Sequence, residues 1–190
     1  MNLTRPTIEF RRNPMPHSGP DVHRLDDVVS EKILSVMREA SAQLRDLGIR
    51  HAVAGGLAVG AWGYPRATKD VDFLVGDEAY RVYPSGLVTM SPGVPIQIRS
   101  VPIDSIPMSP GEGFLESDVS APVVSDGIPI VSIEGLAFLK LKSPRSRDSL
   151  DLIELLRQGV DPKPIREYVE MNAPDLLGKF EAVVLRSQDE

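Results

Sequence analysis

The chain has 190 residues, enough for one domain with appendages, and its 42% hydrophobic residues are enough to build a sizeable core. A formal net charge of −6 argues against a nucleic-acid coat protein, whose affinity would depend on many Lys and Arg contacts to phosphate. The sequence contains no cysteine, which excludes disulfides, zinc–thiolate sites and thiol nucleophiles.

No apolar run approaches the roughly 18 residues that are needed to span a bilayer, and the first residues contain no apolar signal segment. We therefore expect a cytoplasmic protein without a membrane partner. Residues 1–24 are rich in proline, arginine and polar side chains, which predicts a mobile N-terminal arm. We expect residues 25–145 to form the core and residues 146–190 to form a C-terminal helical segment packed on it.

The first part of the core is predicted to alternate helices and strands. Apolar residues recur at helical spacing over residues 26–47, with Asp26 or Asp27 as the expected N-cap. A strand over 49–54, a short helix over 57–62 and a second strand over 70–75 should follow. The middle of the chain holds short β-like runs whose prolines favour edge strands or bulges: residues 87–90, 94–99, 101–106 and 128–131.

The last third of the chain is predicted to be helical. Ser132 can cap a helix over residues 133–142, and a second helix should run over 147–158. Asp161 followed by Pro162 predicts the start of a third helix, and a fourth is expected over 174–185. The elements together indicate an α+β fold, a mixed β-sheet flanked by helices with a C-terminal helical segment.

Asp70 and Asp72 form the strongest chemical signal in the sequence. They lie two residues apart in a predicted strand, so their side chains leave the same face. Two adjacent carboxylates repel each other unless a cation neutralises them, and hard, oxygen-preferring Mg²⁺ suits such a pair. An Asp-x-Asp pair is also common in solvated strands and turns, so the pair needs support from its surroundings.

Gly55 and Gly56 lie between a predicted strand and a short predicted helix. Glycine allows close approach of the backbone to a ligand, and a helix N-terminus presents unpaired N–H groups. This combination can hold a phosphate chain. With two metal ions on the carboxylates it would suit in-line displacement at phosphorus.

Residues 54–75 resemble the signature of the DNA polymerase β-type nucleotidyltransferase superfamily. The matching features are a hydrophobic residue, Gly-Gly, a spacer and Asp-x-Asp. The small bacterial branch around the AbiEii-type toxins and minimal nucleotidyltransferases is the most similar. The lead-in to Asp70, which contains Arg66, Thr68 and Lys69, is typical of that branch. The resemblance implies nucleotide binding by these three residues.

A second match covers residues 134–152. Relatives carry a lysine on one helix and then Arg-Asp and a further Asp at the start of the next, and these positions correspond to Lys140, Arg147, Asp148 and Asp151. The resemblance implies that Lys140 and Asp148 contribute to nucleotide binding. The residues alone leave other readings open. Both Lys140 and Lys142 could face solvent, Arg147 and Asp151 have the spacing of a helix-surface ion pair, and Asp148 could be structural.

Members of the family use a third carboxylate on a later strand, and Asp104 is our candidate for it. Asp104 lies in an apolar run, where an unpaired carboxylate would be costly. The alternative is an ordinary turn residue close to Pro107. The resemblance then implies a site in which Asp70, Asp72 and Asp104 bind metal and carry catalysis.

The function predicted from the sequence is a Mg²⁺-dependent, or Mn²⁺-dependent, nucleotidyltransferase with a nucleoside triphosphate as substrate. It would transfer a nucleoside monophosphate to a hydroxyl of RNA such as a tRNA end, of a protein or of a small molecule. The resemblance also implies a toxin–antitoxin component with a cognate antitoxin. The alternative is a catalytically inactive module of the same fold that binds a nucleotide or a partner.

Overall fold

The computed structural model describes residues 19–109 and 111–189. Its helices are α1 (Glu31–Asp46), α2 (Gly55–Ala61), α3 (Glu116–Ser120), α4 (Ile133–Lys142), α5 (Ser146–Arg157), α6 (Pro162–Asn172) and α7 (Leu177–Gln188). Short 3-10 helices occur at Val22–Leu25, Asp77–Ala79, Gly113–Leu115 and Pro174–Leu176. The strands are β1 (His51–Val53), β2 (Val71–Val75), β3 (Tyr80–Val82), β4 (Val88–Met90), β5 (Gln97–Ile98), β6 (Val101–Pro107), β7 (Val123–Ser125) and β8 (Ile128–Ile130).

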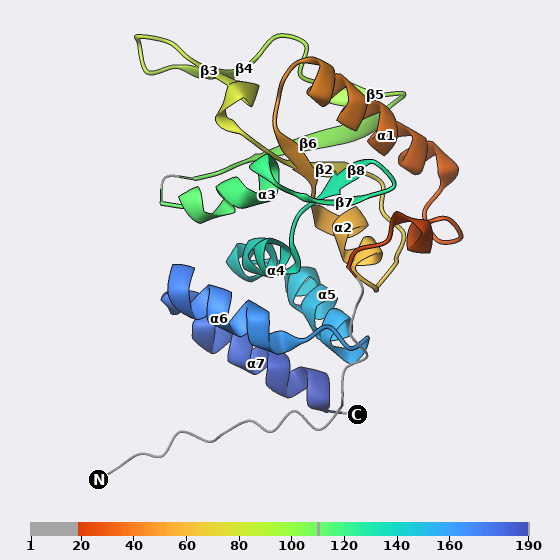
Figure 1. Cartoon of the computed structure of the whole chain (residues 1–190), viewed down its shortest axis with the longest axis vertical. Coiled ribbons are helices and arrows are strands. Elements are labelled where there is room, and N and C mark those ends of the chain that lie inside the picture. The colour runs from red at the N-terminus through yellow and green to blue at the C-terminus, as the bar shows by residue number, and fades with distance from the viewer. Residues whose placement is uncertain (1–18, 110, 190) are drawn as a thin grey trace.

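Six of these strands form a mixed sheet in the order β5-β6-β2-β1-β8-β7. β2 pairs in parallel with β6 and antiparallel with β1, and β1 pairs in parallel with β8. The four C-terminal helices α4 to α7 gather on one side of the molecule below the sheet (Figure 1). The predicted α+β class, a mixed sheet flanked by helices with a C-terminal helical segment, is confirmed.

The central strand β2 is buried on both faces of the sheet. Val71, Phe73, Leu74 and Val75 of β2 are fully buried, and only Asp72 interrupts the run. A strand that is apolar on both faces belongs in the middle of a covered sheet. Helix α1 packs a buried apolar stripe against this core: Ile33, Val36, Met37, Ala40 and Leu44.

The predicted start of the first long helix is wrong. Ser30, rather than Asp26 or Asp27, is the N-cap of α1, and its hydroxyl accepts a hydrogen bond from the Ile33 N–H. The preceding residues form a 3-10 helix and turns, with Val22 and Leu25 buried in the core. The packed chain thus begins before the boundary predicted at residue 25. Residues 1–18 of the predicted arm lie outside the described residues.

The prolines in the β-like runs mislead about strand position. Pro102 lies in β6 and Pro129 in β8, and both strands are internal to the sheet rather than edges. Each proline pairs only with a short outer strand, Pro102 with β5 and Pro129 with β7. The residue pairs with the central strands begin beyond them, at Ile103 and Ile130. The missing N–H groups therefore leave the central ladders intact.

A two-stranded hairpin of β3 and β4 follows β2 and projects from the body (Figure 1). Its second strand, β4, falls within the β-like run predicted over residues 87–90. β3, β7 and α3 were not predicted, and they are only three, three and five residues long. No helix in the described ranges is both long enough and apolar enough to cross a membrane.

Capping residues explain why the C-terminal helices follow the prediction closely. The Ser132 side chain accepts a hydrogen bond from the Gly135 N–H at the start of α4. The Asp161 side chain accepts one from the Lys163 N–H, 2.9 Å away, and Pro162 occupies the first turn of α6. Both caps are local signals that can be read without knowledge of the tertiary structure.

We expect Asp161→Ala to lower the free energy of unfolding by about 1 kcal/mol, because the first turn of α6 loses its capping acceptor. Asp161→Asn retains an acceptor and should differ from the wild type by only a few tenths of a kcal/mol, roughly. Urea denaturation followed by circular dichroism measures both. Equal losses in the two variants would show that capping does not stabilise this helix.

Candidate functional site

Two aspartates face each other across the central strands. Asp72 of β2 and Asp104 of β6 are direct partners in the parallel register, so their side chains leave the same face of the sheet. Asp70 precedes β2 by one residue. All three aspartates line one cavity of about 360 Å³. Asp104 is therefore a mid-strand residue beside the Asp-x-Asp pair, and the alternative of an ordinary turn residue is wrong.

These carboxylates carry unneutralised charge. Among residues 19–109 and 111–189, none of the three makes an ion pair within 4 Å. The chemistry of this donor set, carboxylate oxygens beside one another, fits a hard divalent cation such as Mg²⁺. Within the same residues, no three His, Cys, Asp or Glu side chains lie close enough together to bind one metal ion as they stand. The side chains as placed thus share a cavity without converging.

The Asp72 carboxyl has a raised pKa. Burial raises its pKa, the charges of Asp70 and Asp104 raise it further, and the value reaches about 6. The positive charge of Lys140 and a hydrogen bond from the Gly56 N–H lower the pKa but do not offset these effects. A raised carboxyl pKa means that ionised Asp72 is costly until a cation or another positive group approaches.

The two glycines form the first turn of α2, and contacts within the protein require glycine at position 55 and leave little room at position 56. Gly55 has φ +56°, and a Cβ there would lie 1.7 Å from Oδ2 of Asp72. A Cβ on Gly56 would lie 3.3 Å from both Arg66 Nη1 and Thr68 Oγ1. The close approach predicted for a phosphate is thus made, in this structure, by the Asp72 carboxylate. Gly55 and Gly56 both line the cavity.

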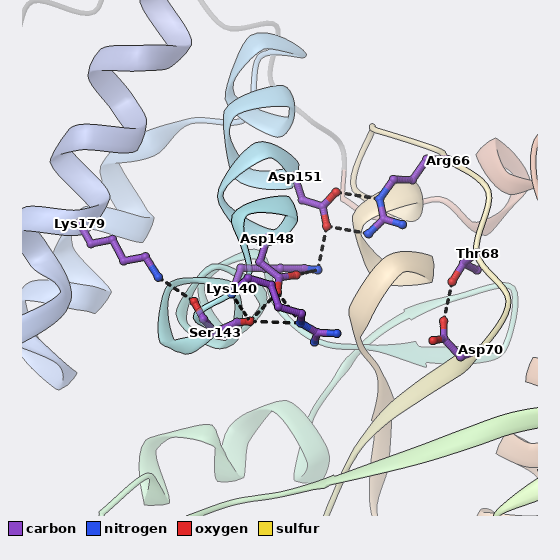
Figure 2. Close-up of polar contacts among 9 residues, drawn as sticks. Arg66, Thr68, Asp70, Lys140, Ser143, Asp148, Asp151 and Lys179 are labelled. Carbon is purple, nitrogen blue, oxygen red and sulfur yellow. Dashed lines mark hydrogen bonds and ion pairs between the residues drawn. The ribbon is translucent and has the colours of Figure 1, made fainter.

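Two of the cations predicted to bind nucleotide, Arg66 and Lys140, are paired with buried carboxylates on α5. Arg66 Nε and Nη2 donate hydrogen bonds to the two Asp151 oxygens, each at a distance of 2.7 Å, and Asp151 is 1% exposed. Lys140 Nζ donates hydrogen bonds to Asp148 at a distance of 2.5 Å and to Asp151 at 2.8 Å. Figure 2 shows Asp151 between Arg66 and Lys140. Lys140 is thus buried rather than solvent-facing, and the predicted surface pair between Arg147 and Asp151 is wrong.

Asp148 closes the other end of this network. Its carboxylate accepts a hydrogen bond from Ser143 Oγ at a distance of 2.5 Å, as Figure 2 shows. Arg145 Nε donates a second hydrogen bond to it at a distance of 3.1 Å. Burial raises the pKa of Asp148, but the hydrogen bonds from Lys140 and Ser143 outweigh burial and the net shift is downward. Asp148 therefore stays ionised at neutral pH. Lys142, by contrast, is exposed and contacts Glu112 and Ser109.

Two other cations face the cavity with their charges available. Lys69 and Arg147 both line it and are exposed, and within the described ranges neither has a hydrogen-bond or ion-pair partner. Lys69 was predicted to bind nucleotide. Arg147 was not assigned that role, and neither was Arg145, which also lines the cavity. The sequence signal for both is the Arg-Ser-Arg run after Pro144, where α5 begins.

No protein-family model and no curated protein matches the chain. Among solved structures it is similar to the crystal structure of an antigenic nucleotidyltransferase-like protein from Paracoccidioides brasiliensis, with a TM-score of 0.45 and 16% sequence identity. The alignment covers 83% of this chain and 94% of that one. This likeness of folds is coarse and does not point to the AbiEii-type branch. The chemistry of the site therefore has to come from its own residues.

We expect Asp72→Asn to stabilise the protein without metal by about 3 kcal/mol at pH 7.5. The pKa of Asp72 is about 6 in the folded protein against an ordinary 3.8, so its ionisation above pH 6 opposes folding. The gain should shrink as the pH falls through 6 and vanish below about pH 4, where the carboxyl is protonated in both states.

Urea denaturation in the presence of EDTA at several pH values measures this difference. Asp175→Asn, which changes an exposed aspartate at the opposite end of the chain, is the matched control and should show no such pH-dependent gain. An Asp72→Asn variant no more stable than the wild type at pH 7.5 would contradict the expected repulsion.

Proposed function

We propose that this protein is a Mg²⁺-dependent nucleotidyltransferase that moves a nucleoside monophosphate from a nucleoside triphosphate to an acceptor hydroxyl. One observation carries the proposal: Asp72 and Asp104 are in register on parallel strands and share a cavity with Asp70 and with unpaired cations. A cavity lined by both carboxylates and cations suits a metal-bound triphosphate, because its metal ion needs negative ligands and its phosphate oxygens need positive ones.

Asp70, Asp72 and Asp104 would hold the metal. Bound there, Mg²⁺ would supply Lewis-acid stabilisation of the charge on the phosphate oxygens. Manganese, which also takes oxygen ligands, would be the expected substitute. Within the described residues no cation is ion-paired with any of the three carboxylates, so their negative charge remains available for a metal ion.

In the transfer step, the acceptor oxygen forms a bond to the α-phosphorus while the bond from that phosphorus to the bridging oxygen breaks. Pyrophosphate leaves, and the proton of the acceptor hydroxyl passes to a base. Asp104 is the proposed base, because it is exposed at the cavity while Asp72 is largely buried. Lys69 and Arg147 would bind the triphosphate oxygens from the loop before β2 and the first turn of α5.

The acceptor classes stay predictions: RNA such as a tRNA end, a protein or a small molecule. A cognate antitoxin as partner likewise stays a prediction of the sequence resemblance. A screen of the four α-³²P-labelled triphosphates against total tRNA, the protein itself and small alcohols, with Mg²⁺ or Mn²⁺, would identify the acceptor by the appearance of label in it.

We expect Asp72→Ala to lower transfer by roughly 1,000-fold or more, because the metal loses a central ligand. Pyrophosphate release and label transfer measure the rate. Asp175→Ala, on the surface away from the cavity, should retain wild-type activity. Full activity of Asp72→Ala would overturn the proposed reaction.

We expect Lys69→Ala and Arg147→Ala each to raise KM for the triphosphate about 10-fold, because each loses a charge-assisted contact to phosphate. Binding of a fluorescent triphosphate analogue measures the same loss without turnover. Lys163→Ala removes an exposed lysine on α6 and is the matched control. Unchanged affinity in both cavity variants would remove these residues from the nucleotide site.

A second function is favoured by the lack, within the described residues, of three converging acidic or histidine side chains. In this alternative the protein binds a nucleotide without catalysis. Triphosphate binding would then persist in EDTA and in Asp72→Ala, and no acceptor would become labelled. Loss of binding on metal removal would instead favour the enzyme.

A further inference from the structure

The segment that carries Asp70 has little support of its own. Residues 65–70 connect α2 to β2. Within the described residues, none of the backbone hydrogen bonds outside helices and strands involves any of these six residues. The last such bond before the segment runs from the Tyr64 N–H to the Val59 carbonyl. A connection without backbone hydrogen bonds has to be placed by side chains.

Arg66 supplies the strongest of these side-chain contacts. Its guanidinium binds the Asp151 carboxylate through two N–H donors, each at a distance of 2.7 Å from its acceptor oxygen. Such a bidentate pair fixes orientation as well as distance. The Arg66 side chain is 17% exposed and that of Asp151 is 2% exposed, so water screens the pair weakly.

Asp151 is a fixed reference point for this contact. It lies on α5, between the buried residues Leu152 and Ile153 and the buried Asp148. Lys140 of α4 donates to both Asp148 and Asp151, so the two carboxylates share one lysine between two helices. Displacement of Asp151 would break contacts on α4 as well as the contact to Arg66.

Thr68 and Asp70 make a second side-chain contact in the same segment. Thr68 Oγ1 donates a hydrogen bond to Asp70 Oδ1 at a distance of 2.7 Å, and Figure 2 shows this contact. Arg66 and Thr68 both pack against the start of α2, where a Cβ on Gly56 would lie 3.3 Å from an atom of each. The Thr68–Asp70 contact lies within the segment, so the contact of Arg66 with Asp151 of α5 is the hydrogen-bonded tie between this segment and a helix.

We propose that Asp151 is a positioning residue for metal binding: through Arg66 it places the 65–70 segment, and with it Asp70, at the cavity that Asp72 and Asp104 also line. The inference rests on the proposed function, since it concerns the cation assigned there to these carboxylates. Asp151 acts at a distance and touches neither nucleotide nor metal.

Two competing roles make different predictions. If Arg66 bound the triphosphate directly, loss of Asp151 would change the nucleotide affinity and leave metal affinity in the absence of nucleotide intact. If Asp151 served only to neutralise Lys140 and Arg66 in a buried network, its loss would lower stability and leave the metal affinity of the folded protein intact.

The test is titration of Mn²⁺ into the protein without nucleotide, followed by electron paramagnetic resonance of the remaining aqueous Mn²⁺. We expect Asp151→Asn to weaken Mn²⁺ binding roughly 10- to 100-fold, the usual effect of losing a residue that orients a metal ligand. Hydrogen–deuterium exchange should increase in peptides that cover residues 65–70 and stay at the wild-type level in β1.

Arg66→Lys is the companion variant. It is needed because Asp151→Asn removes the negative charge that Arg66 and Lys140 share, and this loss can unfold the chain. Lysine preserves the charge balance but cannot form the two-pronged contact. It should weaken Mn²⁺ binding in the same direction as Asp151→Asn. Lys179→Met is the matched control. It removes the α7 lysine that donates to the Leu141 and Ser143 carbonyls, and so disturbs α4 without touching Arg66.

Weaker Mn²⁺ binding in Asp151→Asn and Arg66→Lys, with wild-type binding in Lys179→Met, supports the positioning role. Wild-type Mn²⁺ affinity in a folded Asp151→Asn or Arg66→Lys variant overturns it while leaving the proposed function in place. No Mn²⁺ binding by the wild-type protein itself overturns the metal-dependent function, and the positioning role with it.

Discussion

The parallel pairing of β2 with β6 is the constraint on which the rest of this site depends. Five residue pairs join the strands, and one of them is Asp72 with Asp104. A shift of β6 by one residue would turn Asp104 to the opposite face of the sheet and place Ile103 or Ser105 beside Asp72. The register is held by burial, because Val101 and Ile103 of β6 would leave the core in the shifted arrangement. Hydrophobic packing thus sets the geometry of the carboxylates.

Around this pair the charges divide into two groups with different roles. Arg66, Lys140, Asp148 and Asp151 compensate one another where the helices meet the loop before β2, and this group is largely withdrawn from water. Lys69 and Arg147 stay exposed at the cavity. Buried ion pairs recover their desolvation cost only with good geometry, which the short contacts of the first group provide. The first group orders the backbone, and the second remains available to a ligand.

Much of the fold could be predicted from the sequence, since its signals are local. Ser132 and Asp161 mark helix starts by bonding to N–H groups two or three residues away. The site could be predicted only in part. Asp70 and Asp72 lie two residues apart, but the contact between Arg66 and Asp151 spans 85 positions. Local spacing suggested Arg147 as the partner of Asp151, because periodicity does not reveal that this face of α5 is buried.

The contact between Gly55 and Asp72 has a consequence for how such a chain can diverge. Their atoms are so close that any side chain at position 55 would occupy the space of the carboxylate. The two positions should therefore change together. A descendant that gains a side chain at 55 would have to shorten or lose the acid at 72. Loss of the glycine would then mark, in the sequence alone, a lineage that had given up the acidic site while keeping the sheet.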